Sequence, residues 1–97
     1  MLTKEQINLL LHFNPDCMSV TDLKICRKAF QDFPEEAANF MFPCESDRAS
    51  TITTLLWYVK YTLYAREARL EGNVIAAIRE EECADAAYNE LPPYAKW

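Results

Sequence analysis

Side chains able to support catalysis are few in this sequence. His12 is the only histidine, and no two cysteines have the Cys-x-x-Cys spacing of a structural zinc site or a redox pair. The four thiols are Cys17, Cys26, Cys44 and Cys83. To serve as the base of a cysteine nucleophile, His12 would need one of them beside it; the simpler interpretation is a partly exposed histidine at a helix end. We therefore expect a non-enzymatic protein with no catalytic residue, no metal site and no cofactor.

A carboxylate cluster near the end of the chain is the other group with a chemical interpretation. Glu81, Glu82 and Asp85 lie within about one helical turn of each other, and such oxygens could hold a divalent cation. The alternative, which we favour, is a solvated acidic face partly neutralised by Arg79. A glycine-rich phosphate loop is excluded because the chain has a single glycine.

Three basic residues, Lys24, Arg27 and Lys28, share one face of the predicted helix 20–32. With the preceding helix, this segment could form a helix-turn-helix whose basic side chains meet DNA phosphates. The connection NPDCMS is longer than the usual turn of about three or four residues. The net charge of −5 also opposes binding to nucleic acid. A small DNA-binding regulator is therefore our alternative prediction, and a solvated face is the simpler interpretation.

The segment from Ile52 to Ala65, ITTLLWYVKYTLYA, is apolar on two faces when it is read as a helix. The first stripe contains Ile52, Leu55, Leu56, Val59 and Leu63, and the second contains Trp57, Tyr61, Tyr64, Ala65 and Ala68. A surface helix needs only one such stripe. The second must be covered by helices of the first half of the chain, by a second copy or by a target.

Aromatic residues are the side chains we expect to bind a partner or form an oligomer interface. Tyrosine and tryptophan bury a large area with a polar tip, and they are enriched at interface hot spots. The predicted interface residues are Trp57, Tyr58, Tyr61, Tyr64, Tyr94 and Trp97. The last two belong to the tail 92–97, which either folds back as a clasp or protrudes as a docking strip.

Helices account for nearly the whole chain in the predicted organisation. Thr3 with Gln6 has capping-box spacing, Ser19 or Thr21 can cap a second helix, and Pro34 can open a third. Predicted helices span about 3–13, 20–32, 34–42, 46–71 and 73–91. Alanines are expected to allow close approach of the last helix, with Val74 and Ile78 among the residues that supply bulk. We expect one domain, 1–97: short helices in 1–43, a hairpin in 46–91 and an extended tail.

Gly72-Asn73 is the only break signal in the second half of the chain. If Gly72 adopts a left-handed conformation and Asn73 caps the next helix, the two long helices form an antiparallel hairpin, which we favour. The alternative is a continuous rod. In the hairpin, Arg66 and Arg69 could contact the last carbonyls of its first helix, or form salt bridges with Glu80 and Glu81 of its second helix.

Composition agrees with an all-α fold, a small bundle of four to five helices built on the C-terminal hairpin. The chain has 97 residues, of which 51% are hydrophobic. Its acidic balance favours a protein partner with a basic surface over nucleic acid. Lys60 interrupts the only long apolar segment, so no membrane span is expected. The N-terminus lacks a signal-peptide core and the thiols are scattered, which predicts a cytoplasmic protein.

Two resemblances concern the C-terminal part. Gly72-Asn73-Val74-x-x-Ala77-Ile78 followed by Ala84 resembles part of one tetratricopeptide repeat, which implies helical-hairpin geometry only, because there is no second copy. The close of the chain is also similar to the ends of small helical proteins encoded by bacteriophages and prophages. The residues concerned are Arg66-x-x-Arg69-Leu70-x-Gly72-Asn73, Ala77-Ile78, Glu82, Tyr88-Asn89-x-Leu91-Pro92 and Trp97. This second resemblance implies an accessory protein that binds and blocks a host enzyme or defence complex.

These observations predict a binding module that acts by stoichiometric occlusion. We expect an acidic helical surface bearing aromatic residues to dock on a basic site of a host protein that serves in defence or handles nucleic acid. We also expect a homodimer through the second stripe. If the protein is phage-encoded, it acts in the host cytoplasm.

Overall fold

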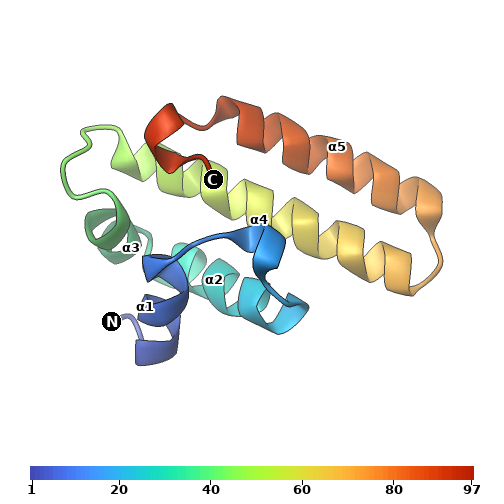
Figure 1. Cartoon of the computed structure of the whole chain (residues 1–97), viewed down its shortest axis with the longest axis horizontal. Helices are drawn as coiled ribbons and strands as arrows, with labels where there is room; N and C mark the ends of the chain where they lie inside the picture. The colour runs from blue at the N-terminus through green and yellow to red at the C-terminus, as the bar shows by residue number, and fades with distance from the viewer.

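A computed structural model describes all 97 residues and contains helices only, as the sequence predicts (Figure 1). Five α-helices are joined by short connections, with one 3-10 helix between α1 and α2 and another in the tail. In chain order the elements are α1 Lys4–Leu11, η1 Pro15–Cys17, α2 Val20–Asp32, α3 Pro34–Met41, α4 Arg48–Leu70, α5 Val74–Glu90 and η2 Pro93–Ala95.

Capping residues set the helix starts in the first half of the chain. The Thr3 hydroxyl accepts a hydrogen bond from the Gln6 backbone N–H, and the Gln6 side chain accepts one from the Thr3 N–H, which completes the predicted capping box. Ser19 rather than Thr21 caps α2. Helix α1 ends at Leu11, two residues before the predicted end, because the chain already turns at His12 to enter η1 at Pro15.

The predicted hairpin is confirmed. Gly72 has a φ of +79°, the left-handed conformation that favours glycine. Around it the Asn73 N–H donates to the Ala68 carbonyl and the Gly72 N–H donates to the Arg69 carbonyl, which closes the end of α4. The Asn73 side chain then accepts from the Ala76 N–H and opens α5. The two long helices therefore run antiparallel rather than as one rod.

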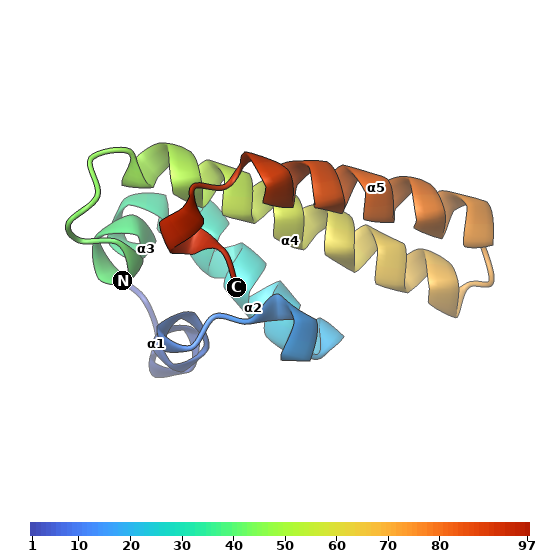
Figure 2. The ribbon, with the colours of Figure 1, turned by 45° about the horizontal axis from the view of Figure 1, so that its top comes forward.

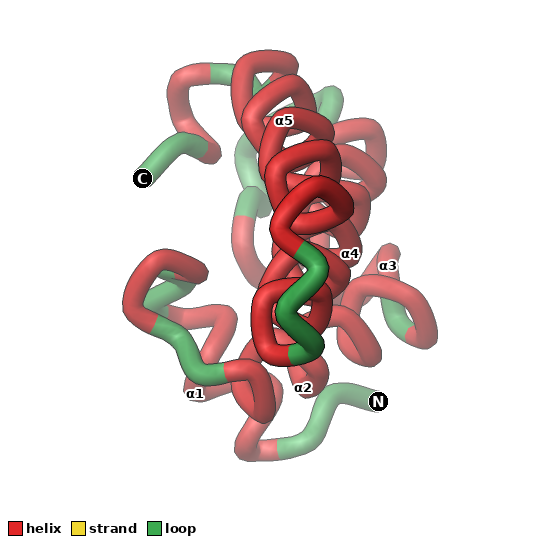
Figure 3. The backbone as a smooth tube through the Cα atoms, turned by 90° about the vertical axis from the view of Figure 1, so that its right-hand side faces the viewer, coloured by secondary structure: helices red, strands yellow, loops and turns green.

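Helix α4 lies in the middle of the molecule, with α5 on one side and the N-terminal helices on the other (Figure 3). Its first apolar stripe forms the core: Leu55, Val59 and Leu63 are almost fully buried. They belong to one cluster with Leu23 and Phe30 of α2 and the alanines of α3. The predicted inner face of α4 is therefore correct.

Helix α5 approaches α4 through small residues, as predicted, because Ala77, Ala84 and Ala87 are its buried positions. The expectation that Val74 and Ile78 supply bulk to this contact is wrong: both are exposed. They lie in the first turns of α5, where the hairpin projects beyond the N-terminal helices (Figure 1). No element lies there to cover them.

The sequence predicted an extended tail, but part of the tail is helical. Residues 93–95 form η2, in which the Ala95 N–H donates to the Pro92 carbonyl. The chain then turns back from the end of α5 towards the connection between α1 and α2 (Figure 2). None of the helices combines the length and apolarity needed to cross a bilayer.

Candidate protein-binding surface

The structure divides the six predicted aromatic residues into three groups. Trp57 and Tyr61 lie together on the outer side of the hairpin. Tyr58, Tyr94 and Trp97 hold the tail against the rest of the molecule. Tyr64 lies beside α2.

Trp57 and Tyr61 are four residues apart on α4, so their side chains share one face of the helix. Their rings stack with centroids 5.8 Å apart and planes inclined by 24°. Trp57 is 49% exposed, and the Lys60 ammonium lies 5.5 Å from the centre of its ring. Helices α1 to α3 therefore do not cover this part of the second stripe.

A groove of about 320 Å³ lies beside this aromatic pair, between α4 and α5. Apart from Trp57 and Tyr61, it is lined by Thr54, Cys83, Ala86, Ala87 and Glu90. Because alanine side chains are short, the α5 side of the groove forms a shallow apolar floor next to the two rings. Glu90 is the only charged residue in the lining. We call the groove and its two aromatic rings the Trp57 groove.

Tyr64 continues the second stripe and is 41% exposed. The Arg27 guanidinium of α2 lies 5.8 Å from the centre of its ring, in a cation–π arrangement. Lys28 forms a salt bridge of 3.0 Å with Asp32, and Lys24 is exposed. The predicted basic face thus has Arg27 and Lys28 engaged within the chain. The connection to α1 spans residues 12–19 and includes η1, so it is not the tight turn of a helix-turn-helix.

Trp97 packs among three aromatic rings from distant parts of the chain. Its centroid lies 4.8 Å from that of Tyr58, 4.8 Å from that of Tyr88 and 5.7 Å from that of Phe13, all edge to face. The indole N–H donates to Asp16 Oδ2 over 3.1 Å, and the Tyr88 hydroxyl donates to the Trp97 carbonyl over 2.7 Å. Of the two predicted alternatives for the tail, the structure has the clasp.

Tyr94 makes the second attachment of the tail. Its hydroxyl donates to Asp47, which precedes α4, and shares a hydrogen bond of 2.7 Å with the Thr51 hydroxyl. Its ring packs edge to face on Phe42, with centroids 5.1 Å apart. Tyr58, Tyr94 and Trp97 therefore have internal structural contacts, which leaves Trp57, Tyr61 and Tyr64 as the predicted aromatic residues that do not hold the tail.

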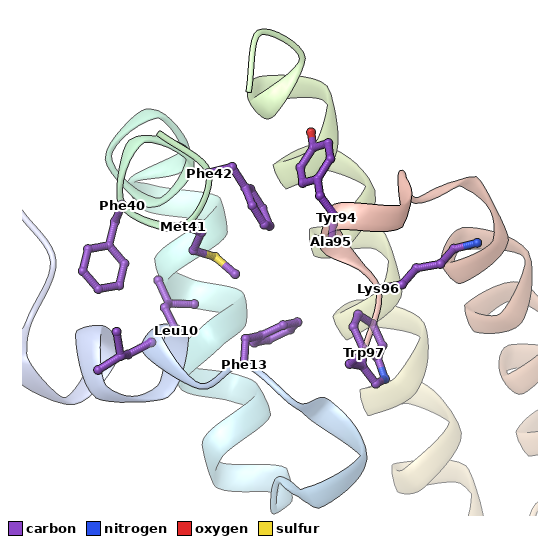
Figure 4. Close-up of a pocket in the computed structure, with 10 residues that line it drawn as sticks. Leu10, Phe13, Phe40, Met41, Phe42, Tyr94, Ala95, Lys96 and Trp97 are labelled. Atoms are coloured by element: carbon purple, nitrogen blue, oxygen red, sulfur yellow. The ribbon is translucent and has the colours of Figure 1, made fainter. Parts of the chain in front are cut away.

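An apolar pocket of about 260 Å³ lies between α1, α3 and the tail (Figure 4). Leu10 and Phe13 approach from one side, the residues 40–42 from another, and Tyr94 and Trp97 from the tail. Lys96 belongs to the same wall, but its side chain points away from the cavity. Sequence reasoning missed this pocket because three separate segments build it. The run Phe40-Met41-Phe42 at the end of a predicted helix was the available signal.

The hairpin turn carries a second feature that sequence reasoning missed. Leu70 is 82% exposed and Ile75 is 74% exposed; beside them Val74 and Ile78 are 53% and 46% exposed. Together they form an apolar patch at the projecting end of the hairpin. The consecutive apolar pair Val74-Ile75, next to the turn, was the signal for it, since both cannot face α4.

Of the three carboxylates predicted to lie together on α5, Glu81 forms a salt bridge, whereas Glu82 and Asp85 form none. Arg69 donates to both Glu81 oxygens, over 2.8 and 2.7 Å, which confirms the predicted salt bridge across the hairpin. The hydrogen bonds from Arg69 lower the pKa of Glu81. Arg66 instead donates to the carbonyls of Met18 and Pro15. The structure contains no group of three or more His, Cys, Asp or Glu side chains placed to hold a metal ion.

All four cysteines are free. Cys26 is fully buried in the core, and this burial, together with the charge of Asp22, raises the pKa of its thiol to about 12. Cys17 and Cys44 are exposed, and Cys83 lines the Trp57 groove at intermediate exposure. The buried thiol is therefore held in its neutral, unreactive form.

No family model, curated protein or solved structure matches this chain. The Trp57 groove offers two stacked aromatic rings beside an apolar floor; Glu90 is the only charged residue of its lining, and the Lys60 ammonium lies over the Trp57 ring. Such an arrangement can bury apolar groups of another molecule.

Proposed function

We propose that this protein is a non-enzymatic binding module, encoded by a bacteriophage, that inhibits a host protein by occluding one of its functional sites. The observation that carries the proposal is the half-exposed Trp57, stacked on Tyr61 beside the apolar floor of the groove. Monomeric proteins rarely leave such a surface uncovered without a use. Large, rigid aromatic side chains next to an apolar floor are typical of interface hot spots.

The target is a protein with a basic surface, and it meets this module in the host cytoplasm. The chain carries a net charge of −5, and the only charged residue lining the Trp57 groove is Glu90. Opposite charge on the target would speed its association and fix its orientation, while burial of Trp57 and Tyr61 would supply most of the affinity. A host protein of the defence systems, or one that handles nucleic acid, presents such a basic site.

In the absence of its target the protein forms a homodimer through the same face. A second copy would cover the exposed Trp57 and Tyr64 and the partly exposed Tyr61 of the second stripe. Two chains of charge −5 repel each other, so this dimer is weak, and a basic target can displace one copy. Self-association therefore protects the surface without blocking its function.

Affinity capture from a bacterial lysate tests the proposal. The wild-type chain should retain a specific basic protein, and the double variant Trp57→Ala with Tyr61→Ala should lose it. Phe40→Ala is the matched control, because Phe40 is also an exposed aromatic residue but lies on α3. Equal retention of that protein by the double variant would overturn the assignment of the Trp57 groove.

The stoichiometry distinguishes occlusion from catalysis. When the captured protein is titrated with the wild-type chain, its activity should fall in proportion to the amount added and stop falling at one chain per site. Removal of the chain with a denaturing wash and refolding of the target should restore activity. Loss of target activity at far lower ratios would show that the chain is an enzyme.

A further inference from the structure

A second cleft, separate from the Trp57 groove, lies where η1, α4, α5 and the end of the tail meet. Its volume is about 290 Å³, and its lining consists of Asp16, Tyr58, Asp85, Tyr88 and Trp97. Each of these side chains is either an aromatic ring or a carboxylate. The two sites share no lining residue.

The three rings of the cleft hold one another in place. Trp97 meets Tyr58 and Tyr88 edge to face, with centroids 4.8 Å apart in both pairs, and the two tyrosines lie 6.3 Å apart at 55°. The Trp97 indole N–H donates a hydrogen bond to Asp16, and the Tyr88 hydroxyl donates one to the Trp97 carbonyl. A ligand entering the cleft would therefore meet rings that lose little further conformational freedom.

The two carboxylates that line the cleft form no salt bridge. Asp16 accepts hydrogen bonds from Trp97 and Tyr58, which leaves acceptor sites on its carboxylate, and neither Asp16 nor Asp85 takes part in a salt bridge. Burial, and then the charge of Asp16, raises the pKa of Tyr58, and Asp85 contributes in the same direction. The negative potential of both carboxylates therefore reaches Tyr58.

The chain itself places a cation on this aromatic cluster. The Lys96 ammonium lies 5.4 Å from the centre of the Tyr88 ring. Cations are attracted to the faces of aromatic rings, and more strongly where carboxylates lie beside them. Tyr88 thus already has a cation over its ring. The charged residues that line the cleft itself, Asp16 and Asp85, are both negative.

We propose that the cleft formed by Asp16, Tyr58, Asp85, Tyr88 and Trp97 binds the guanidinium group of a single arginine side chain from a partner protein. A guanidinium is planar, so it can stack on an aromatic ring while its N–H groups donate to a carboxylate in the same plane. An ammonium ion is compact and strongly hydrated, so it can lie over a ring face or donate to a carboxylate, but it cannot stack a plane on the ring while donating within that plane. This site is separate from the Trp57 groove, and its binding of an arginine does not depend on what that groove binds.

Indole N–H signals in a nuclear magnetic resonance titration test this proposal on the full chain. The probe is Nα-acetyl-arginine amide, and the neutral comparison is Nα-acetyl-citrulline amide, which has nearly the same shape. The arginine probe should shift the Trp97 signal in a saturable manner and leave the Trp57 signal in place, because only Trp97 lines the cleft. An equal response to citrulline, or none of Trp97 to arginine, would overturn the proposal.

Charge variants locate the binding site. Asp85→Asn should weaken binding of the arginine probe by roughly threefold, the range of a partly exposed ion pair. Glu82→Gln removes a carboxylate from the same helix outside the cleft and should change the affinity by less than about 1.5-fold. Asp85 and Glu82 are both exposed, so both variants should fold. Equal weakening by the two would show that the probe senses only the net charge, and would refute the site.

The corresponding lysine probe, Nα-acetyl-lysine amide, decides between the two cationic groups. If stacking of a planar group matters, the lysine probe should bind at least about threefold more weakly than the arginine probe. Equal affinities would refute the assignment to a guanidinium.

Discussion

The two tryptophans carry opposite roles that only their surroundings distinguish. Trp97 packs on Phe13, Tyr58 and Tyr88 and donates to Asp16, whereas Trp57 is half-exposed. We expect Trp97→Ala to lower the free energy of unfolding by about 3 kcal/mol, because it leaves a cavity among the aromatic rings and removes the hydrogen bond to Asp16. Trp57→Ala should cost less than about 1 kcal/mol. Urea denaturation of both variants measures the difference, and equal costs would contradict the clasp.

Cys26 provides a residue-scale prediction with a definite pH dependence. In the unfolded chain this thiol ionises near the ordinary cysteine pKa of 9.0, but burial raises the pKa to about 12 in the fold. The neutral thiol is therefore favoured by folding. Its contribution to stability is complete below pH 9 and is lost as the pH rises towards 12. Between these limits the wild type should lose stability faster than Cys26→Ala, as measured by urea denaturation at each pH.

Thiol labelling gives an independent check on the same residue. With a chromogenic disulfide reagent at pH 8, the exposed Cys17 and Cys44 of the native protein should react first. Cys26 should react only when the chain is unfolded. Rapid labelling of Cys26 in the native protein would contradict its burial in the core.

For single residues, the sequence indicated which side chains share a helix face, but it did not indicate which distant residues they contact. The spacing of Trp57, Tyr61 and Tyr64 placed them on one stripe of a helix, but it left open whether the N-terminal helices, a second copy or a target covers that stripe. The contacts of Asp16 could not be predicted, because it accepts from Tyr58 and Trp97, which are 42 and 81 residues away in the sequence. Periodicity carries no information about contacts across such separations.

The hairpin turn is the element on which the arrangement of α4 and α5 depends. Gly72 has a φ of +79°, and an added Cβ would meet no atom within 4 Å, so only backbone strain opposes a side chain there. We expect Gly72→Ala to destabilise the protein by about 1 kcal/mol and Gly72→Asn by less, because asparagine tolerates the left-handed conformation. Thermal unfolding of both variants provides the measurement. A neutral Gly72→Ala would mean that the turn is not held in this conformation.

Helix boundaries were predictable where local chemistry sets them. The side-chain oxygens of Thr3, Ser19 and Asn73 cap the helix that follows each of them, Pro34 opens α3, and Gly72 ends α4 with its positive φ. Each of these signals is local and can be read in the sequence. The exposed positions of α5 were not predictable in the same way. Whether Val74 and Ile78 are covered depends on how far α2 extends along α4, and that is a property of the tertiary packing.

At the scale of the molecule, α4 contributes to the core and to two surface sites that differ in chemistry. The Trp57 groove offers apolar area with one charge, and the cleft at Asp16 and Asp85 offers aromatic rings with two carboxylates. Composition and periodicity predicted the all-α fold, because a chain with 51% hydrophobic residues and one glycine favours long helices. They could not predict the cleft, since it exists only once the tail has folded back.

The net charge of −5 gives the two proposed associations opposite salt dependences. Two copies repel each other, so raising the salt from about 0.05 to 0.5 M, which shortens the screening length, should increase the dimer fraction. Binding to a basic target should weaken over the same range, because the attraction is screened. Size-exclusion chromatography with light scattering measures the dimer, and Trp57→Glu should remain monomeric throughout because it places a charge in the apolar contact. A wild-type dimer that dissociates as salt is added would instead be held by ion pairs, and the exposed stripe of Trp57, Tyr61 and Tyr64 could not be its interface.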